Sequence, residues 1–243
     1  DETFSVLNNN RLLNNEVWTL PIIFQISKEE KNNLPEDGLI AIKDKKSNNV
    51  FALMNITSIE KINKIDEMAS KWYGTNNEKH PGVSKFLKDG DYILCGKPFI
   101  LKGQKYISSY SPFDLTTKQT REIINHNGWY NVIGFHTRNV LHKGHEFIQK
   151  YAIEESNADA IFISPVSGIK KPQDYKTEVI IECYEKAIKE NLFNYCPVLI
   201  GTFNTYSRYA GPREAVFTAL CRKNFGCNYF IIGRDHTGLG KFY

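Results

Sequence analysis

The chain has 243 residues, which is enough for one large or two small domains with a sizeable core. Hydrophobic residues make up 41%, aromatic residues 13% and charged residues 24%, so the composition excludes a disordered chain, a collagen-like repeat and a coiled-coil array. Because 31 basic residues stand against 27 acidic ones, the net charge of +4 is too small to indicate nucleic-acid binding, and any anion site must be local.

Targeting and redox signals are weak. No apolar run approaches the roughly 18 residues that span a bilayer, and residues 1–20 lack the zones of a signal peptide, so we expect a cytoplasmic protein with no membrane partner. Five cysteines without a CxxC pair indicate reduced thiols rather than disulfides or a zinc knuckle. The start at Asp1 and the end at Tyr243, after a glycine-rich stretch, are typical of a fragment that lacks both ends.

The sequence predicts a β-rich, barrel-like domain over residues 1–118. Short runs rich in Val, Ile and Phe, bounded by Pro, Asp-Gly and Ser-Asn-Asn turns, predict its strands. These runs cover residues 17–26, 38–43, 50–59, 92–94 and 98–101. A helix is predicted over residues 64–73, ended by Gly74. His80 stands in a polar stretch, where a lone histidine is more often structural or solvated than catalytic, and we assign it no role.

From residue 119 to residue 243 strands and helices alternate, which predicts an α/β domain with a parallel sheet. The predicted strands are 131–135, 158–164, 197–202 and 228–232, and the helices are 142–155, 174–190 and 212–225. Ligands of open parallel sheets bind beyond the carboxyl ends of the strands. The candidate site segments are therefore residues 136–139, 165–168, 203–213 and 233–236.

The first of these segments runs into His142-Lys143-Gly144-His145 at the start of a helix. The i, i+3 spacing places both imidazoles on one face, the free N–H groups of the first turn favour an anion, and Gly144 lets a ligand approach the backbone. Four apolar residues of this helix are expected to face the sheet: Phe147, Ile148, Tyr151 and Ala152. Zinc is a rival use, but it usually takes i, i+4 histidines and a third protein ligand. Two solvated histidines are the remaining alternative.

A second candidate anion site precedes the helix of residues 212–225. Arg208 and Arg213 flank a glycine turn at the helix N-terminus, which suits phosphate or sulfate. The alternative is that these are surface arginines paired with carboxylates such as Glu214. The glycine-rich loop after the last strand is by itself a weak signal.

Three segments carry a resemblance: GFHTRNVLHKGHEF, SRYAGPREAVFTALCRKNFGC and IIGRDHTGLGKFY. They are similar to the signature stretches of ATP sulfurylase (sulfate adenylyltransferase), whose usual forms are QTRNPxHxxHE, RYAGPREA and GRDHAG. The likeness extends through SPVSGIKKPQDY and back to VWTLPI and HPGV near residue 81. The resemblance implies a PUA-like domain followed by a Rossmann-like nucleotidylyltransferase domain of the HxGH superfamily.

The resemblance also implies a reaction, in which ATP and sulfate give adenosine 5′-phosphosulfate and pyrophosphate by direct in-line transfer, with Mg²⁺ on the ATP and no metal site of the protein itself. The implied catalytic residues are Arg138, Asn139, His142, His145 and Arg208. The implied substrate-binding residues are His136, Thr137, Ala210, Gly233, Arg234, Asp235 and His236. Arg138 and Arg208 would hold sulfate, the two histidines and Asn139 would contact the ATP phosphates, and residues 233–236 would line the adenosine pocket. A homo-oligomer and an adenylylsulfate kinase partner are further expectations.

The chain departs from the family pattern in several places. The family's Gln before Thr-Arg-Asn is His136, and the usual His of the HPLxG-like segment is Ser164. The SPLxGF stretch and the sheet elements that follow the GRDHxG loop in the family are absent from the sequence. The unperturbed pKa of an imidazole is about 6.5, and a nearby dianion favours the cation, so we expect oxyanion affinity to weaken as pH rises through the pKa of His136 in the native protein. Two alternatives stay open: an adenylyltransferase for another oxyanion, such as a phosphonate, sulfonate or selenate, and a non-catalytic nucleotide- or sulfate-binding relative.

Overall fold

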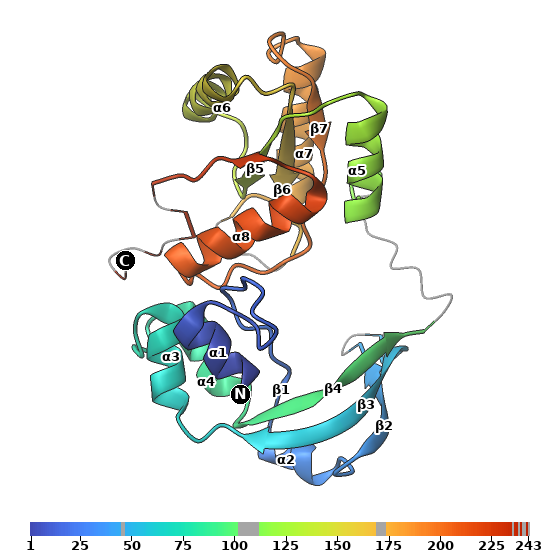
Figure 1. Ribbon diagram of the computed structural model, residues 1–243, viewed down its shortest axis with the longest axis vertical. Coiled ribbons are helices and arrows are strands. Elements are labelled where there is room, and N and C mark those ends of the chain that lie inside the picture. Colours follow the sequence, from blue (N-terminus) through green and yellow to red (C-terminus); the bar gives the residue numbers. More distant parts are fainter. Residues whose placement is uncertain are drawn as a thin grey trace. The chain divides into compact units, whose positions relative to one another are not determined.

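The structure is a computed structural model that describes residues 1–44, 47–101, 112–168, 174–234, 236, 237, 239 and 242. The chain divides into two compact units (Figure 1). The first comprises Asp1–Ile107, Tyr209–Arg213 and Gly238–Tyr243, and the second comprises Ser108–Arg208 and Glu214–Thr237. In the described part of the chain no helix is long and apolar enough to cross a membrane.

An antiparallel sheet in the order β1-β4-β3-β2 forms the first unit. Its strands are β1 (Gln25–Ile26), β2 (Gly38–Lys43), β3 (Val50–Lys61) and β4 (Tyr92–Ile100). Met54 and Ile56 alternate with more exposed neighbours along β3 and pack against Leu94 of β4, as the period of two requires. The described residues form an open four-stranded sheet rather than the expected barrel. Of the strand expected over residues 17–26, Gln25 and Ile26 pair with β4, and Val17 forms an isolated bridge with Arg11. The two strands expected over residues 92–101 are one.

Four helices complete the first unit: α1 (Glu2–Asn9), α2 (Lys28–Asn32), α3 (Ile65–Tyr73) and α4 (Pro81–Lys88). The sequence predicts only α3, which ends before Gly74 as expected. His80 is fully buried at the N-cap of α4, where its Nδ1 accepts the backbone N–H groups of Gly82 (3.1 Å) and Val83 (3.3 Å). Its Nε2 therefore carries the proton and donates to the carbonyl oxygen of Tyr209 at 2.9 Å. His80 is structural, which is one of the two roles expected for it.

Arg213 also belongs to the first unit, where it binds the C-terminal end of α1. Its Nη1 donates to the carbonyl oxygens of Val6 (3.0 Å) and Thr19 (2.8 Å) and to Oδ1 of Asn10 (2.8 Å), and its Nη2 donates to the carbonyl oxygen of Leu7 (3.0 Å). Carbonyl groups in the last turn of a helix often lack intrahelical partners, and the guanidinium adds donors to them at the end of α1. The expectation that Arg213 contributes to an anion site is therefore wrong.

The second unit has a parallel sheet in the order β7-β6-β5-β8, which confirms the predicted α/β architecture. Its strands are β5 (Val132–Thr137), β6 (Ala160–Pro165), β7 (Val198–Ile200) and β8 (Tyr229–Phe230), and its helices are α5 (Thr117–His126), α6 (Lys143–Ser156), α7 (Thr177–Lys189) and α8 (Pro212–Phe225). The sequence does not predict α5, which begins with a capping box between Thr116 and Gln119.

Helices cover both faces of this sheet. On one face Ile133 and Phe135 of β5 pack with Ile153 of α6 and Tyr184 of α7. On the other face the alternate residue Val132 packs with residues of α5 and α8, and α7 and α8 lie on opposite sides of the strands in Figure 1. The same alternation places residues 134 and 136 of β5 on the α8 face, at the carboxyl end of the strand.

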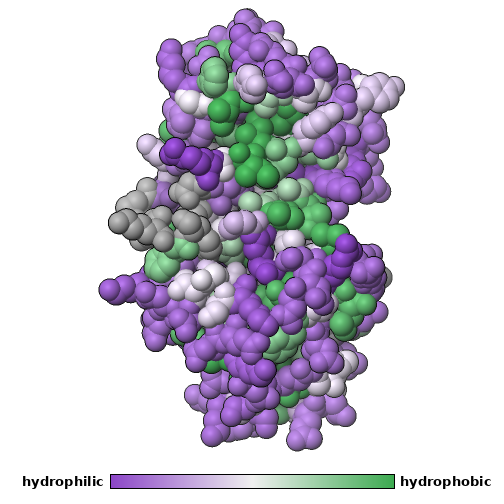
Figure 2. Space-filling model, turned by 60° about the vertical axis from the view of Figure 1, so that its left-hand side comes forward, coloured by the Kyte–Doolittle hydropathy of each residue, from purple (hydrophilic) through white to green (hydrophobic). Residues whose placement is uncertain are grey.

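The buried face of α6 differs from the expected one. Phe147 and Tyr151 are 69% and 54% exposed, and their rings stack 6.2 Å apart on the surface. Gln149 is instead fully buried, and its Nε2 donates to the hydroxyl of Tyr184 at 3.2 Å. Ile148 and Ala152 pack against the core as expected. Figure 2 shows that apolar side chains also gather in patches on the surface between hydrophilic areas.

Candidate active site

The first histidine of the HxGH segment caps α6. Nδ1 of His142 accepts the backbone N–H groups of Gly144 (3.1 Å) and His145 (3.3 Å), the arrangement that His80 makes at α4. A Cβ on Gly144 would lie 3.1 to 3.2 Å from the His142 ring, so the glycine makes room for this ring. Because Nδ1 accepts, the neutral imidazole carries its proton on Nε2 and offers a donor there.

The second histidine stacks on the first. The ring centroids of His142 and His145 are 3.8 Å apart with the planes at 25°, so the two imidazoles lie on one face as predicted. Burial, followed by the charge of His142, lowers the pKa of His145 to about 4. Its Nδ1 is buried without a hydrogen-bond partner in the described part of the chain. At neutral pH His145 is therefore uncharged, and the pair lies at the N-terminus of a 14-residue helix, where the helix dipole favours an anion.

The loop between β5 and α6 is held by Thr137, which is buried. Its Oγ1 accepts the backbone N–H of Asn139 at 3.0 Å and donates to the carbonyl oxygen of the same residue at 2.9 Å. The Asn139 side chain is left exposed. Arg138, between them, pairs with Asp174 at 3.6 Å between Nη1 and Oδ2. That distance is an ion pair rather than a hydrogen bond.

Arg208 is 8% exposed and rests on aromatic rings. Its guanidinium carbon lies 4.1 Å from the ring centroid of Tyr206 and 5.8 Å from that of Phe217. Nη1 donates weakly to Oγ1 of Thr205 at 3.4 Å, while Nε is buried without a partner among the described residues. Glu214 accepts the backbone N–H of Arg208 at 2.9 Å and so binds the loop that carries the arginine. Ala210, in contrast, belongs to the Tyr209–Arg213 segment of the first unit, where it is buried.

His136 has a partner that the sequence did not indicate. Nη2 of Arg222, from α8, lies 2.9 Å from Nδ1 of His136, and Arg222 is fully buried. Burial, and then the charges of Arg222, His236 and Arg138, lower the pKa of His136 well below its usual value. The expectation of a cationic His136 near neutral pH is therefore wrong. Gly134 is the sequence signal for this burial, because its lack of a side chain leaves room for the arginine. A Cβ at position 134 would lie 3.1 Å from Cβ and Cγ of Arg222.

The segment after β8 reaches the same end of the sheet through His236. Its ring lies 5.7 Å from that of His136, and burial, with the charges of Arg138 and Arg222, lowers its pKa to about 4. Gly233 and Arg234 are exposed, and the space where a Cβ of Gly233 would stand is open. Asp235 lies outside the described residues. Side chains that follow β5 and β8 thus lie close together at the carboxyl ends of the strands, as the sequence analysis predicts for a parallel sheet.

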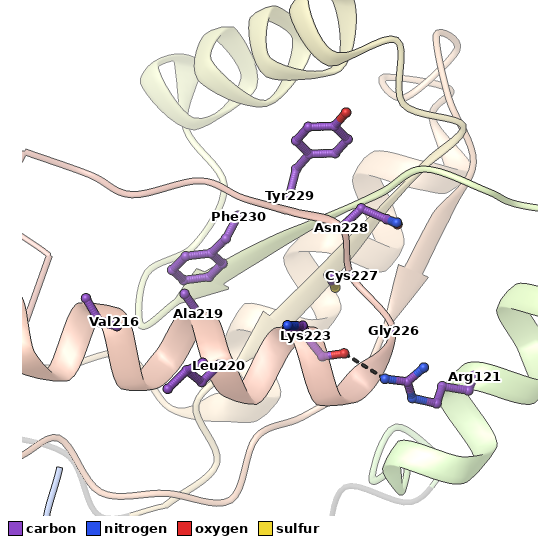
Figure 3. A pocket seen from close by; sticks show the side chains of 10 residues that line it. All are labelled: Arg121, Val216, Ala219, Leu220, Lys223, Gly226, Cys227, Asn228, Tyr229 and Phe230. Atoms are coloured by element: carbon purple, nitrogen blue, oxygen red, sulfur yellow. Dashed lines mark hydrogen bonds between the residues drawn. The ribbon is translucent and has the colours of Figure 1, made fainter. Parts of the chain in front are cut away.

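A separate cavity of about 600 Å³ runs along α8, and Figure 3 shows its lining. Arg121 stands at one end, where Nη2 donates to the carbonyl oxygen of Lys223 at 2.9 Å. Tyr229 and Phe230 of β8 and Val216 and Leu220 of α8 supply most of its apolar wall. None of the predicted site residues that the structure describes lines this cavity.

Known proteins are similar to the chain over almost all of its length. The ATP-sulfurylase family model matches residues 111–243, and the PUA-like domain model matches residues 1–102. The sulfate adenylyltransferase of Halothermothrix orenii is 36% identical over 98% of this chain and 61% of its own length. Those of Symbiobacterium thermophilum and Pyrococcus abyssi are 38% identical over 98% of this chain and 59% and 60% of their own lengths.

A solved structure has the same fold. The hexameric APS kinase from Thiobacillus denitrificans superposes with a TM-score of 0.70 and 15% identity, over 96% of this chain and 41% of that one. The chain spans about three fifths of the length of the curated relatives that it matches. Because the ATP-sulfurylase model matches more than half of its residues, in addition to the PUA-like match, the chain belongs to the ATP-sulfurylase family.

Proposed function

We propose that the protein is a sulfate adenylyltransferase, which converts ATP and sulfate into adenosine 5′-phosphosulfate and pyrophosphate. The observation that carries the proposal is the stacked pair of His142 and His145 at the N-terminus of α6. The pair places two imidazole rings at the N-terminus of α6, directly after the loop that holds Arg138, and its first ring already caps the N–H groups of Gly144 and His145. This arrangement suits a polyphosphate next to a second oxyanion.

The chemistry requires positioning rather than proton transfer. A sulfate oxygen attacks the α-phosphorus of ATP, a new P–O bond forms, and the bond from that phosphorus to the α,β-bridging oxygen breaks as pyrophosphate leaves. Sulfate is already deprotonated, so no general base is needed. The two polyanions repel each other, and the protein must align them and stabilise the charge that develops on the leaving group.

We assign the phosphates of MgATP to the HxGH side of the site. His142 would donate from Nε2, because its Nδ1 is held by the α6 cap, and His145 and the exposed amide of Asn139 would add further donors. Burial lowers the pKa of His145 to about 4, so at pH 7 its ring would act as a dipole and not as an acid.

We assign sulfate to Arg138, Arg208 and His136. A guanidinium offers two parallel N–H donors to an oxyanion, and sulfate would compete with Asp174 for Arg138 across the long 3.6 Å ion pair. Gly233, Arg234, Asp235 and His236 would line the adenosine pocket, with Thr137 holding the loop. An adenylylsulfate kinase partner, homo-oligomeric assembly and a cytoplasmic location stay predictions.

The test is pyrophosphate release by the protein in its full natural length, measured with MgATP and each oxyanion in turn. We expect release that depends on both ATP and sulfate, and adenosine 5′-phosphosulfate as the second product. Faster release with a phosphonate, a sulfonate or selenate would instead support a paralogous adenylyltransferase. Binding of ATP or sulfate without release under any of these conditions would refute an enzymatic role and leave the non-catalytic relative.

A further inference from the structure

Arg222 carries a buried charge that no carboxylate among the described residues balances. Its side chain is fully buried, and its guanidinium carbon lies 4.2 Å from the ring centroid of Phe203 and 5.5 Å from that of Phe225. The ion pairs among the described residues do not include it, and its Nε and Nη1 have no hydrogen-bond partner in that part of the chain. Burial lowers its pKa to about 10, so it stays charged at neutral pH.

An unbalanced guanidinium is costly in a dry interior, because its hydration is lost and no counter-charge replaces it. Cation–π attraction to the rings of Phe203 and Phe225 offsets only part of the lost hydration free energy. A bound anion at the carboxyl end of the sheet would supply a counter-charge. Arg222 reaches the ligand side of the sheet through one contact, the 2.9 Å approach of Nη2 to Nδ1 of His136 at the carboxyl end of β5.

That contact determines the state of His136. A guanidinium has only donors, so Nδ1 of His136 must accept and the neutral ring must carry its proton on Nε2. Protonation of Nδ1 would break the hydrogen bond and place two cations 2.9 Å apart. Among the described residues, the other charged or titratable groups that face the ring are Arg138, after β5, and His236, after β8, and both also oppose a second positive charge.

We propose that Arg222 is a positioning residue of the oxyanion site, which holds Nε2–H of His136 as a neutral donor to the bound oxyanion and adds its own positive charge through the imidazole. The inference rests on the proposed function, because it takes sulfate as the ligand of His136. It also explains how a histidine can replace the family's glutamine. A glutamine carbonyl would accept from Arg222 and its NH₂ would donate to the oxyanion, which is the same pair of roles.

The test measures sulfate binding by calorimetry with saturating α,β-methylene-ATP, from about pH 6 to about pH 8.5. We expect a flat pH profile in the natural protein. In Arg222→Met, which keeps an apolar stem, affinity should fall about 10- to 100-fold at neutral pH and should strengthen toward pH 6, because Nδ1 can then take a proton. In the double variant with His136→Gln the profile should be flat again.

Arg121→Met is the matched control. Arg121 donates to the carbonyl oxygens of Asn224 and Lys223 at the C-terminal end of α8, so its loss removes a positive charge at the same helix without touching His136. We expect unchanged sulfate affinity and a flat profile. Equal affinity and equally flat profiles in the natural protein and Arg222→Met would overturn the inference.

A second measurement needs no variant and therefore decides the matter if Arg222→Met does not fold. Nitrogen-15 NMR of the histidine rings should show His136 with a protonated Nε2 and an unprotonated Nδ1 over the whole pH range. A protonated Nδ1, or titration of His136 between about pH 6 and about pH 8.5, would overturn the inference. Absence of sulfate binding by the natural protein would refute the proposed function instead, so the two failures are distinguishable.

Discussion

His142→Asn separates the two roles that the structure gives to His142. An asparagine is among the best N-cap residues, so its side-chain oxygen can accept the N–H groups that Nδ1 now accepts, while the outward donor at Nε2 is lost. His142→Ala removes both. The pair of variants therefore measures the cap and the donor independently at one position.

The expected magnitudes differ enough to be resolved. Loss of the cap in His142→Ala should lower the free energy of unfolding by about 1 kcal/mol, whereas His142→Asn should change it by less than about 0.5 kcal/mol. Loss of one preorganised donor to the leaving pyrophosphate should lower the turnover rate by about 10²- to 10³-fold in both variants, or about 3 to 4 kcal/mol of transition-state stabilisation. The affinity for ATP should change far less than turnover.

Urea denaturation and sulfate-dependent pyrophosphate release give the two quantities. His80→Asn is the matched control, because His80 makes the same cap at α4 of the other unit but was assigned no role in the reaction. It loses the bond to Tyr209, so it should lower stability and leave the turnover of the folded protein within a few-fold. If turnover survives in His142→Asn and falls only in His142→Ala, the reasoning is refuted and His142 is a cap alone.

Three further predictions concern charges. Arg138→Lys should lose nearly as much turnover as Arg138→Ala, since an ammonium cannot copy two aligned donors, and steady-state rates over a range of sulfate concentrations measure this. Arg213→Met should lower the free energy of unfolding by about 2 kcal/mol in urea, because the carbonyl groups at the end of α1 lose their donors. The free energy of unfolding in urea should fall as pH drops from about 6.5 toward about 4. Burial lowers the pKa of His145 and of His236 to about 4 in the folded protein, so in this pH range the unfolded chain binds more protons than the folded one.

Each of these predictions has a contrary outcome. Recovery of most activity by Arg138→Lys would show that position 138 supplies only charge. An unchanged unfolding midpoint in Arg213→Met, measured beside the exposed-site control Arg234→Met, would contradict the role of Arg213 at α1. For the acid effect, His145→Asn should lose part of the pH dependence, and an identical pH dependence in the variant would show that His145 does not contribute to it.

The sequence predicts the elements whose signals are local. The proline at the start of α8 and the glycine after it mark its bounds, and the alternation of short apolar runs with amphipathic stretches predicts the parallel sheet. Strand ends then predict where His136 and His236 lie. The likeness to the family adds residue roles that no spacing rule supplies.

The features that the sequence did not predict depend on distant partners. An arginine within a helix is normally solvated, and Arg222 is buried only because Gly134 and His136, which precede it by more than 80 residues, leave space and an acceptor. Helix α1 is short and mostly polar, and its last carbonyl groups are satisfied by Arg213, more than 200 residues away. No local window contains either pair.

The register of β5 and β6 couples two of the chain's departures from its family. His136 and Ser164 are direct partners across these parallel strands, on the α8 face, and Ser164 is fully buried with its hydroxyl unpaired in the described part of the chain. The family pattern has glutamine at position 136 and histidine at position 164, so in this chain the histidine stands on β5 instead of β6. Restoring histidine at position 164 alone would crowd two rings against Arg222, so we expect the two positions to exchange residues only as a pair, with strongly non-additive effects.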